Sequence, residues 1–174
     1  KGAHIAVPRD RLGNRHALTL ISPLDGRVLF ALPADAHAIV GTTDTFTSAA
    51  PDDVRASNED VRYLLETANT FFPRALLGTN DVMSAWAGIR PLLPAAGTTP
   101  GAMTREHSVT TDAQGVIVIT GGKLTTYRIM ARDAVNAVIA QLGRRGRADP
   151  TRSAPLPGGE FESLDDLIAD AARA

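Results

Sequence analysis

The residues best suited to chemistry follow an apolar run that ends near residue 120. Residues 121–126 read Gly-Gly-Lys-Leu-Thr-Thr. If a buried strand ends there and a helix begins, the N–H groups of the helix start and the charge of Lys123 suit an anion. Paired glycines would let a planar or phosphorylated ligand approach the backbone closely. The plainer alternative is a tight strand-to-helix turn in which Thr125 or Thr126 caps the helix.

Two arginines form a second candidate site, because each lies in a segment with the alternation of a strand. Arg90 and Arg105 would stand on half-covered faces, where a guanidinium needs a partner. A phosphate or carboxylate would supply one, and each charge-assisted hydrogen bond contributes roughly 1.5–3 kcal/mol. The alternative is a structural ion pair with an acid such as Asp81 or Glu106.

Histidine offers a candidate base. His4 lies at the start of an apolar segment and could accept a proton near neutral pH. Alternatively, a lone histidine only fills space in the core or on the surface. No two of the four histidines have the spacing of metal ligands, so we predict no metal site. Trp86, Phe71 and Phe72 are predicted to be core residues.

The first half of the chain has the pattern of an antiparallel sheet. Short runs rich in Val, Ile and Leu, separated by turn residues, predict strands at residues 4–8, 18–22, 28–32 and 37–42. Asp25 and Gly26 predict a hairpin turn between the second and third. Ser57 then predicts the cap of a helix that Pro73 ends.

The second half should position the remaining candidates. Alternation from residue 82 predicts a strand that carries Arg90. A hairpin is predicted over residues 104–110 and 116–120, with a second strand that is apolar on both faces and therefore covered. A long amphipathic helix should begin at Gly122 and Lys123 and end near Gly143. Residues 144–159 have the composition of a linker, and Ser163 predicts the cap of a last helix.

Composition excludes several classes of protein. The 174 residues are 44% hydrophobic and 21% charged, which is typical of a folded domain rather than a disordered chain. With no cysteine there is neither a disulfide nor a thiolate site. A net charge of -1 argues against nucleic acid as a partner. The chain contains no G-x-G-x-x-G and no P-loop, so any dinucleotide would need a cradle outside it.

Six segments together resemble the FAD-dependent glycerol-3-phosphate dehydrogenases, and they follow the same order. They include Trp-Ala-Gly-Ile-Arg-Pro-Leu at residues 86–92 and Thr-Gly-Gly-Lys-Leu-Thr-Thr-Tyr-Arg at residues 120–128. The others are residues 1–9, 28–33, 39–44 and 104–107. The likeness extends over residues 1–159. The sequence departs from the family at Ala34, where an aromatic residue is common.

The resemblance implies an α+β fold: an antiparallel sheet with flanking helices, as in the substrate domain of D-amino-acid-oxidase-like flavoproteins. Residues 1–143 would be the substrate-binding half together with the last strand and helix that contact FAD. A linker at 144–159 and the start of a C-terminal helical domain at 160–174 would follow. The chain would be an interior piece of the enzyme, inactive by itself and without bound FAD.

The same resemblance implies oxidation of sn-glycerol 3-phosphate to dihydroxyacetone phosphate by hydride transfer to FAD. Electrons would pass to a quinone, in a cytoplasmic protein held peripherally on the membrane surface. One alternative is an oxidase, or a related FAD oxidoreductase, that uses oxygen. A second alternative is a non-catalytic domain that binds a small anion or a protein.

Site residues follow from the matching positions. His4 and Arg90 would be catalytic, with His4 as the base and Arg90 near the reacting carbon. Arg90, Arg105 and Lys123 would bind substrate, Arg105 taking the phosphate. The expected cofactor-binding residues are Gly121, Gly122, Lys123, Leu124 and Thr125.

Overall fold

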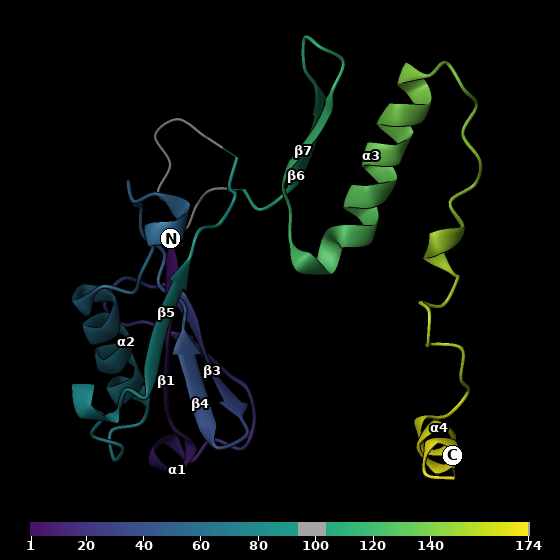
Figure 1. Ribbon diagram of the computed structural model, residues 1–174. Coiled ribbons are helices and arrows are strands. Elements are labelled where there is room, and N and C mark those ends of the chain that lie inside the picture. Colours follow the sequence, from purple (N-terminus) through teal and green to yellow (C-terminus); the bar gives the residue numbers. More distant parts are fainter. Residues whose placement is uncertain (94–103, 174) are drawn as a thin grey trace. The chain divides into compact units, whose positions relative to one another are not determined.

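The computed structural model describes residues 1–93 and 104–173, which fall into two compact units. The units are Lys1–Arg105 and Glu106–Ala174, and each is described by itself (Figure 1). The predicted boundaries at residues 143 and 159 stay predictions.

The first unit is built on a five-stranded antiparallel sheet with the strand order β2-β3-β4-β1-β5. Its strands are β1 (Gly2–Pro8), β2 (Leu18–Ile21), β3 (Val28–Ala34), β4 (His37–Gly41) and β5 (Ser84–Gly88). Its helices are α1 (Arg9–Leu12) and α2 (Asn58–Phe71), with short 3-10 turns at η1 (Pro51–Asp53) and η2 (Thr79–Asp81). An antiparallel sheet with flanking helices confirms the expected fold class.

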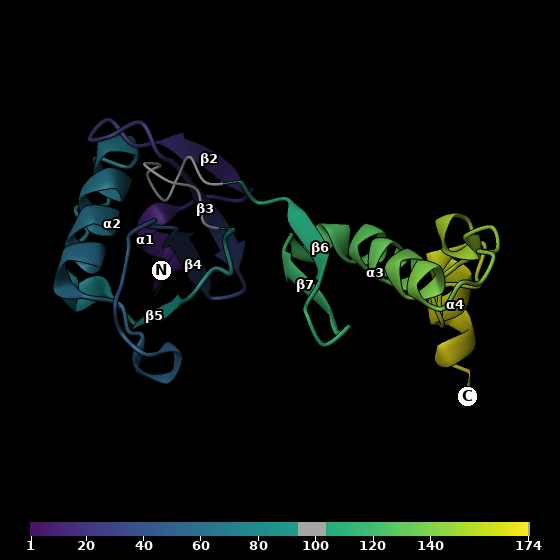
Figure 2. The same ribbon diagram turned by 90° about the horizontal axis from the view of Figure 1, so that it is seen from above.

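One face of this sheet forms the core, because α2 packs against β1 and β4 there. Alternate residues of β1 point to that face, and Ile5 and Val7 are fully buried. Leu64 and Ala68 of α2 meet them and are fully buried as well. The helix and its place on one side of the sheet are visible in Figure 2.

The opposite face of the sheet is open and partly apolar. Register places one row of residues straight across it: Thr19, Phe30, Gly41, His4 and Trp86. Phe30 is 43% exposed and Trp86 is 41% exposed. The prediction that Trp86 is a core residue is therefore wrong, because register puts its indole on the face that α2 does not cover. Phe71, at the last turn of α2, is also exposed, at 42%, whereas Phe72 is partly buried against the core.

Helix α2 begins where the sequence predicted. The hydroxyl of Ser57 accepts from the backbone N–H of Asp60, and the Asp60 carboxylate accepts from the N–H of Ser57. This reciprocal pair fixes the direction in which the helix leaves the loop. Among the residues that the structure describes, no helix has the length and apolar character to cross a bilayer.

The second unit starts with a hairpin and continues into a long helix. Its elements are β6 (His107–Thr111), β7 (Ile117–Gly121), η4 (Leu124–Thr126), α3 (Tyr127–Gln141), η5 (Pro150–Arg152) and α4 (Leu164–Ala171). Ser163 caps α4, as predicted, by accepting from the N–H of Asp166. Helix α3 packs against both strands of the hairpin.

Three expectations for residues 104–141 are wrong. Strand β6 begins at His107, so Arg105 precedes it in irregular backbone. Strand β7 is not covered on both faces, because Val118 and Ile119, which point to opposite sides, are each 40% exposed. The long helix does not begin at Gly122 and Lys123; a 3-10 turn intervenes and α3 starts at Tyr127.

Candidate active site

The sheet topology gathers the candidate site of the first unit at one edge. Strands β4 and β5 are both antiparallel to β1 and lie on either side of it, so they run in the same direction. Their carboxyl ends therefore meet beside the start of β1. Residues 42–44 follow β4, and Gly2 begins β1 between β4 and β5. The expectation that a strand carries Arg90 is wrong, because β5 ends at Gly88 and Arg90 follows it.

Arg90 is held at this edge by a fan of hydrogen bonds. Its Nη1 donates to the Asp44 carboxylate at 3.0 Å, and its Nη2 donates to the hydroxyl of Thr42 at 2.8 Å. Both nitrogens also lie 3.3 Å from the carbonyl oxygen of Thr43. Gly2 provides the space for this side chain, because a Cβ at that position would overlap the guanidinium. The planar, fork-shaped guanidinium of Arg90 is therefore held in one orientation and does not move freely in solvent.

Asp44 joins the two predicted arginines. Its second carboxylate oxygen lies 3.4 Å from Nη2 of Arg105, so one acid bridges both guanidinium groups. The Asp44 side chain is 9% exposed, whereas that of Arg105 is 43% exposed. Burial lowers the pKa of Arg90, Asp44 opposes that shift, and Arg105 adds to it. Two positive charges against one negative charge leave the cluster net positive.

The acid partner of Arg90 is one that the sequence analysis missed. Asp81, one of the acids named there, pairs instead with Arg11. Asp44 lies in residues 39–44, which carried part of the resemblance, but no role was assigned to it. The signal that could have found it is an acid directly after a buried strand, at the sheet edge where Arg90 also emerges.

His4 lies two residues along β1 from Gly2, in the same neighbourhood as Arg90. Its imidazole stacks on the indole of Trp86, with ring centroids 5.6 Å apart and planes 12° apart. A Cβ at Gly41 would overlap this ring, so Gly41 makes room for it. His4, Trp86 and Arg90 line one hollow of about 280 Å³ on the open face.

Burial, together with the charge of Arg90, lowers the pKa of His4 below its usual value of 6.5. The ring is thus neutral at pH 7 and able to accept a proton. Since the unfolded chain takes up this proton at a higher pH than the folded one, stability contributed here is present above pH 6.5 and is lost as pH falls towards the folded-state pKa.

We expect an NMR titration of the His4 ring hydrogens to show a midpoint below 6.5. Arg90→Gln should raise that midpoint, because it removes the nearby positive charge. The His4→Gln variant assigns the resonance. A midpoint at or above 6.5 in the unsubstituted protein would contradict the environment described here.

The second unit holds the other predicted site residues at one junction. Gly121 and Gly122 both have positive φ, 78° and 85°, which favours glycine. A Cβ at Gly121 would lie 2.5 Å from the backbone oxygen of Glu106, and one at Gly122 would overlap the Met130 sulfur. The hydroxyl of Thr126 closes the turn on the backbone of Lys123. The glycines are thus required by the junction itself, which agrees with the plainer alternative of a tight turn, although the Thr126 side chain makes no capping bond to α3.

Three of the predicted site residues lie in the first unit, and the other five lie in the second. In the first unit, Arg90 and Arg105 pair with Asp44, and His4 lines a hollow with Arg90. Gly121, Gly122, Lys123, Leu124 and Thr125 form the strand-to-helix junction of the second unit. Lys123 and Leu124 are exposed there. Leu124 and Thr125 are the first residues of a turn, so no carbonyl within that turn can accept a hydrogen bond from their N–H groups.

The chain is similar in sequence to proteins of known name. The chain is 35% identical, over 97% of its length, to an aerobic glycerol-3-phosphate dehydrogenase of Bacillus subtilis. It is 37% identical, over 82% of its length, to the protein of the same name in Staphylococcus aureus. It spans 31% and 26% of those two proteins, about a third or less of their length.

A solved structure is similar as well. The crystal structure of the glycerol-3-phosphate dehydrogenase of Bacillus halodurans in complex with FAD matches 99% of this chain with a TM-score of 0.80 and 34% identity. The match covers 32% of that protein.

The family follows from the sequence match that runs through both units. The pattern of FAD dependent oxidoreductases (DAO) matches residues 1–136, which include Arg90, Arg105 and the glycine junction. This match, with the relatives above, shows that the chain belongs to the FAD dependent oxidoreductase family.

Proposed function

We propose that the protein carrying this chain oxidises sn-glycerol 3-phosphate to dihydroxyacetone phosphate with FAD, and that this chain supplies its substrate-binding half. The observation that carries the proposal is Arg90 beside the neutral base His4, with Arg105 joined to Arg90 through Asp44. Relatives named glycerol-3-phosphate dehydrogenases, at 34–37% identity, support the choice of substrate.

The arginines suit a phosphorylated substrate. Guanidinium groups stay charged and present paired N–H groups to phosphate oxygens. Arg105 is the more exposed of the two, so we assign it to the phosphate. Arg90 is fixed by three neighbouring residues and lines the hollow with His4, so we assign it to the oxygen on the reacting carbon. His4 accepts the hydroxyl proton of the substrate.

The junction of the second unit fits the flavin cofactor. Its two glycines hold a backbone with positive φ, and the N–H groups of Leu124 and Thr125 are not used within their own turn. With Lys123 beside them, these groups would hold the oxygen-rich edge of FAD, where negative charge is favoured. FAD, when bound, takes up the hydride that leaves the substrate carbon.

Arg105→Ala tests the phosphate assignment in the full-length protein. We expect the KM for glycerol 3-phosphate to rise by tenfold or more, because a lost charge-assisted hydrogen bond is worth about 1.5–3 kcal/mol. Arg74→Ala, at another exposed arginine, is the matched control and should leave the KM unchanged. An unchanged KM in Arg105→Ala would remove this residue from phosphate binding.

We further propose a quinone as the electron acceptor and a peripheral position on the cytoplasmic membrane. The relatives are named dehydrogenases rather than oxidases, which supports an acceptor other than oxygen. The purified full-length protein should reduce a soluble quinone analogue in the presence of glycerol 3-phosphate and consume little oxygen. Stoichiometric hydrogen peroxide would instead identify an oxidase. Cell fractionation should recover the protein with membranes and release it with salt or detergent.

A further inference from the structure

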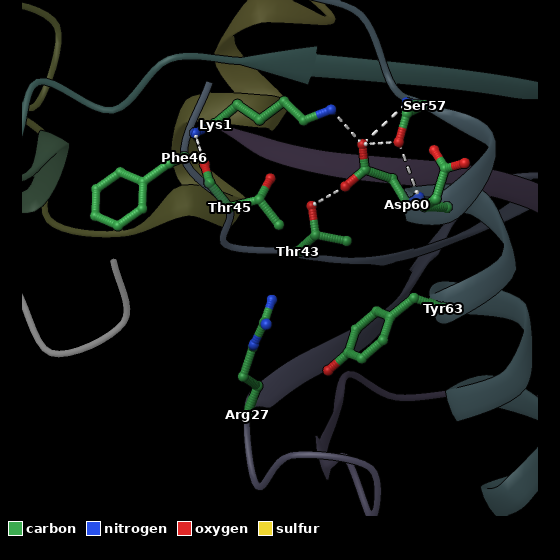
Figure 3. A pocket seen from close by; sticks show the side chains of 9 residues that line it. Lys1, Arg27, Thr43, Thr45, Phe46, Ser57, Asp60 and Tyr63 are labelled. Atoms are coloured by element: carbon green, nitrogen blue, oxygen red, sulfur yellow. Dashed lines mark hydrogen bonds and ion pairs between the residues drawn. The ribbon is translucent and has the colours of Figure 1, made fainter. Parts of the chain in front are cut away.

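Asp60 is a buried acid that the proposed reaction does not use directly. It stands in the first turn of α2 with only 4% of its side chain exposed. Its Oδ2 accepts from Lys1 Nζ at 2.6 Å and from the N–H and hydroxyl of Ser57 at 2.9 and 3.0 Å (Figure 3). The bonds to Ser57 belong to the helix cap, whereas the Oδ1 atom bonds to a residue outside the helix.

The Oδ1 atom of Asp60 accepts from the hydroxyl of Thr43 at 2.9 Å. This contact connects residues from different elements, since Thr43 lies in the segment after β4 (Figure 3). The same hydroxyl accepts from the N–H of Ala3 at 2.9 Å. Thr43 is 2% exposed, so both bonds are sheltered from water.

Charge fixes the direction of these bonds. Burial by itself raises the pKa of Asp60, but hydrogen bonds from Lys1, Ser57 and Thr43 outweigh it and hold the pKa below its ordinary value. An ionised carboxylate only accepts, so the single hydroxyl proton of Thr43 must point to Asp60. The rotamer of Thr43 is then determined by a donor on one side and an acceptor on the other.

The backbone of the same residue faces Arg90. The carbonyl oxygen of Thr43 lies 3.3 Å from both terminal nitrogens of the guanidinium. The two residues that flank Thr43, Thr42 and Asp44, supply the other bonds to Arg90. A rotation of Thr43 would therefore move all three residues that accept hydrogen bonds from Arg90.

We propose that Asp60 and Thr43 are positioning residues that orient Arg90 for substrate binding from the far side of the 42–44 segment. The inference rests on the proposed function, because it takes Arg90 as a substrate ligand. Asp60 anchors the hydroxyl of Thr43, and the carbonyl of Thr43 aligns the fork of Arg90.

The test compares Thr43→Val with Thr43→Ser in the full-length holoenzyme. Valine keeps the shape but loses the hydroxyl, whereas serine keeps the hydroxyl. Thr43→Val should raise the KM for glycerol 3-phosphate, and its Kd by calorimetry, about tenfold. Thr43→Ser should retain values close to those of the unsubstituted enzyme. Equal losses in both variants, or no change in Thr43→Val, would overturn the proposal.

Asp60→Asn has a matched control in Asp81→Asn. Asp81 also accepts from the N–H of a turn's first residue, Gly78, and also pairs with a cation, Arg11, but it has no bond to the 42–44 segment. Both variants should lose stability, while only Asp60→Asn should weaken binding of glycerol 3-phosphate. Equal binding in the two would contradict a role through Thr43.

These experiments distinguish a failure of the proposed function from a failure of the positioning role. If the unsubstituted holoenzyme neither binds nor oxidises glycerol 3-phosphate, the proposed function fails. If it does both and Thr43→Val behaves like it, only the positioning role fails.

Discussion

Replacing Arg90 by alanine in the full-length protein is expected to lower kcat/KM for glycerol 3-phosphate by about 10–10²-fold, the equivalent of one charge-assisted hydrogen bond, because both Nη nitrogens already donate to Thr42, Thr43 and Asp44. The loss should be large because this guanidinium is already oriented before substrate arrives. Its bonds to Thr42, Thr43 and Asp44 set the plane of the fork, and Gly2 leaves room for it. Steady-state kinetics with purified holoenzyme measure the effect.

Arg90→Lys separates charge from geometry. Lysine keeps the positive charge but carries a single nitrogen, which cannot reach two acceptors in one plane. We therefore expect Arg90→Lys to recover only a small part of the activity that Arg90→Ala loses.

Arg11→Lys is the matched control for Arg90→Lys. Arg11 also forms an ion pair and a hydrogen bond to backbone, at Asp81 and Ala75, away from the site edge. Its replacement should leave kcat/KM unchanged. Full activity in Arg90→Lys would show that only charge matters at this position and would contradict the oriented fork.

Much of the first unit could be predicted because its signals are local. Short runs rich in Val, Ile and Leu predicted the four early strands, and Asp25 and Gly26 do form the hairpin turn, with Gly26 at φ 74°. The cap of α2 was also predictable, since Ser57 and the acids after it lie within one turn. Helix α1 was missed because its four residues are too few to show a periodicity.

The partner of Arg90 could not be predicted in the same way. Arg90 and Asp44 are 46 positions apart in the chain and meet only because β1 lies between β4 and β5. Sequence patterns give the strands but not their order in the sheet. Without that order, Asp81 was as reasonable a partner as Asp44.

Exposure was the other property that local patterns misjudged. The sequence of β7 is apolar on both faces, yet Val118 and Ile119 are each 40% exposed. Trp86 is likewise open on the sheet face opposite α2. An apolar pattern indicates which faces of a strand can be buried, whereas the packing of the other elements determines which faces are buried.

Gly121→Ala is expected to abolish flavin retention by the full-length protein, because alanine fits neither the backbone angle nor the space. The φ of 78° is unfavourable for any residue with a Cβ, at a cost of about 1–3 kcal/mol. The Cβ would also lie 2.5 Å from the backbone oxygen of Glu106, which accepts from the N–H of Gly122. That bond must break or move, and the N–H groups of the following turn move with it. Flavin absorbance per protein after gel filtration measures retention.

Gly26→Ala separates backbone strain from the loss of space. Gly26 has a similar φ, 74°, but nothing lies within 4 Å of the Cβ position. Its replacement should cost about 1 kcal/mol in stability and leave flavin retention unchanged. Gly146→Ala, where φ is not positive and space is open, should change neither. If Gly121→Ala retains flavin as well as Gly26→Ala does, the close approach to Glu106 does not shape the cofactor site, and the role assigned to this junction is wrong.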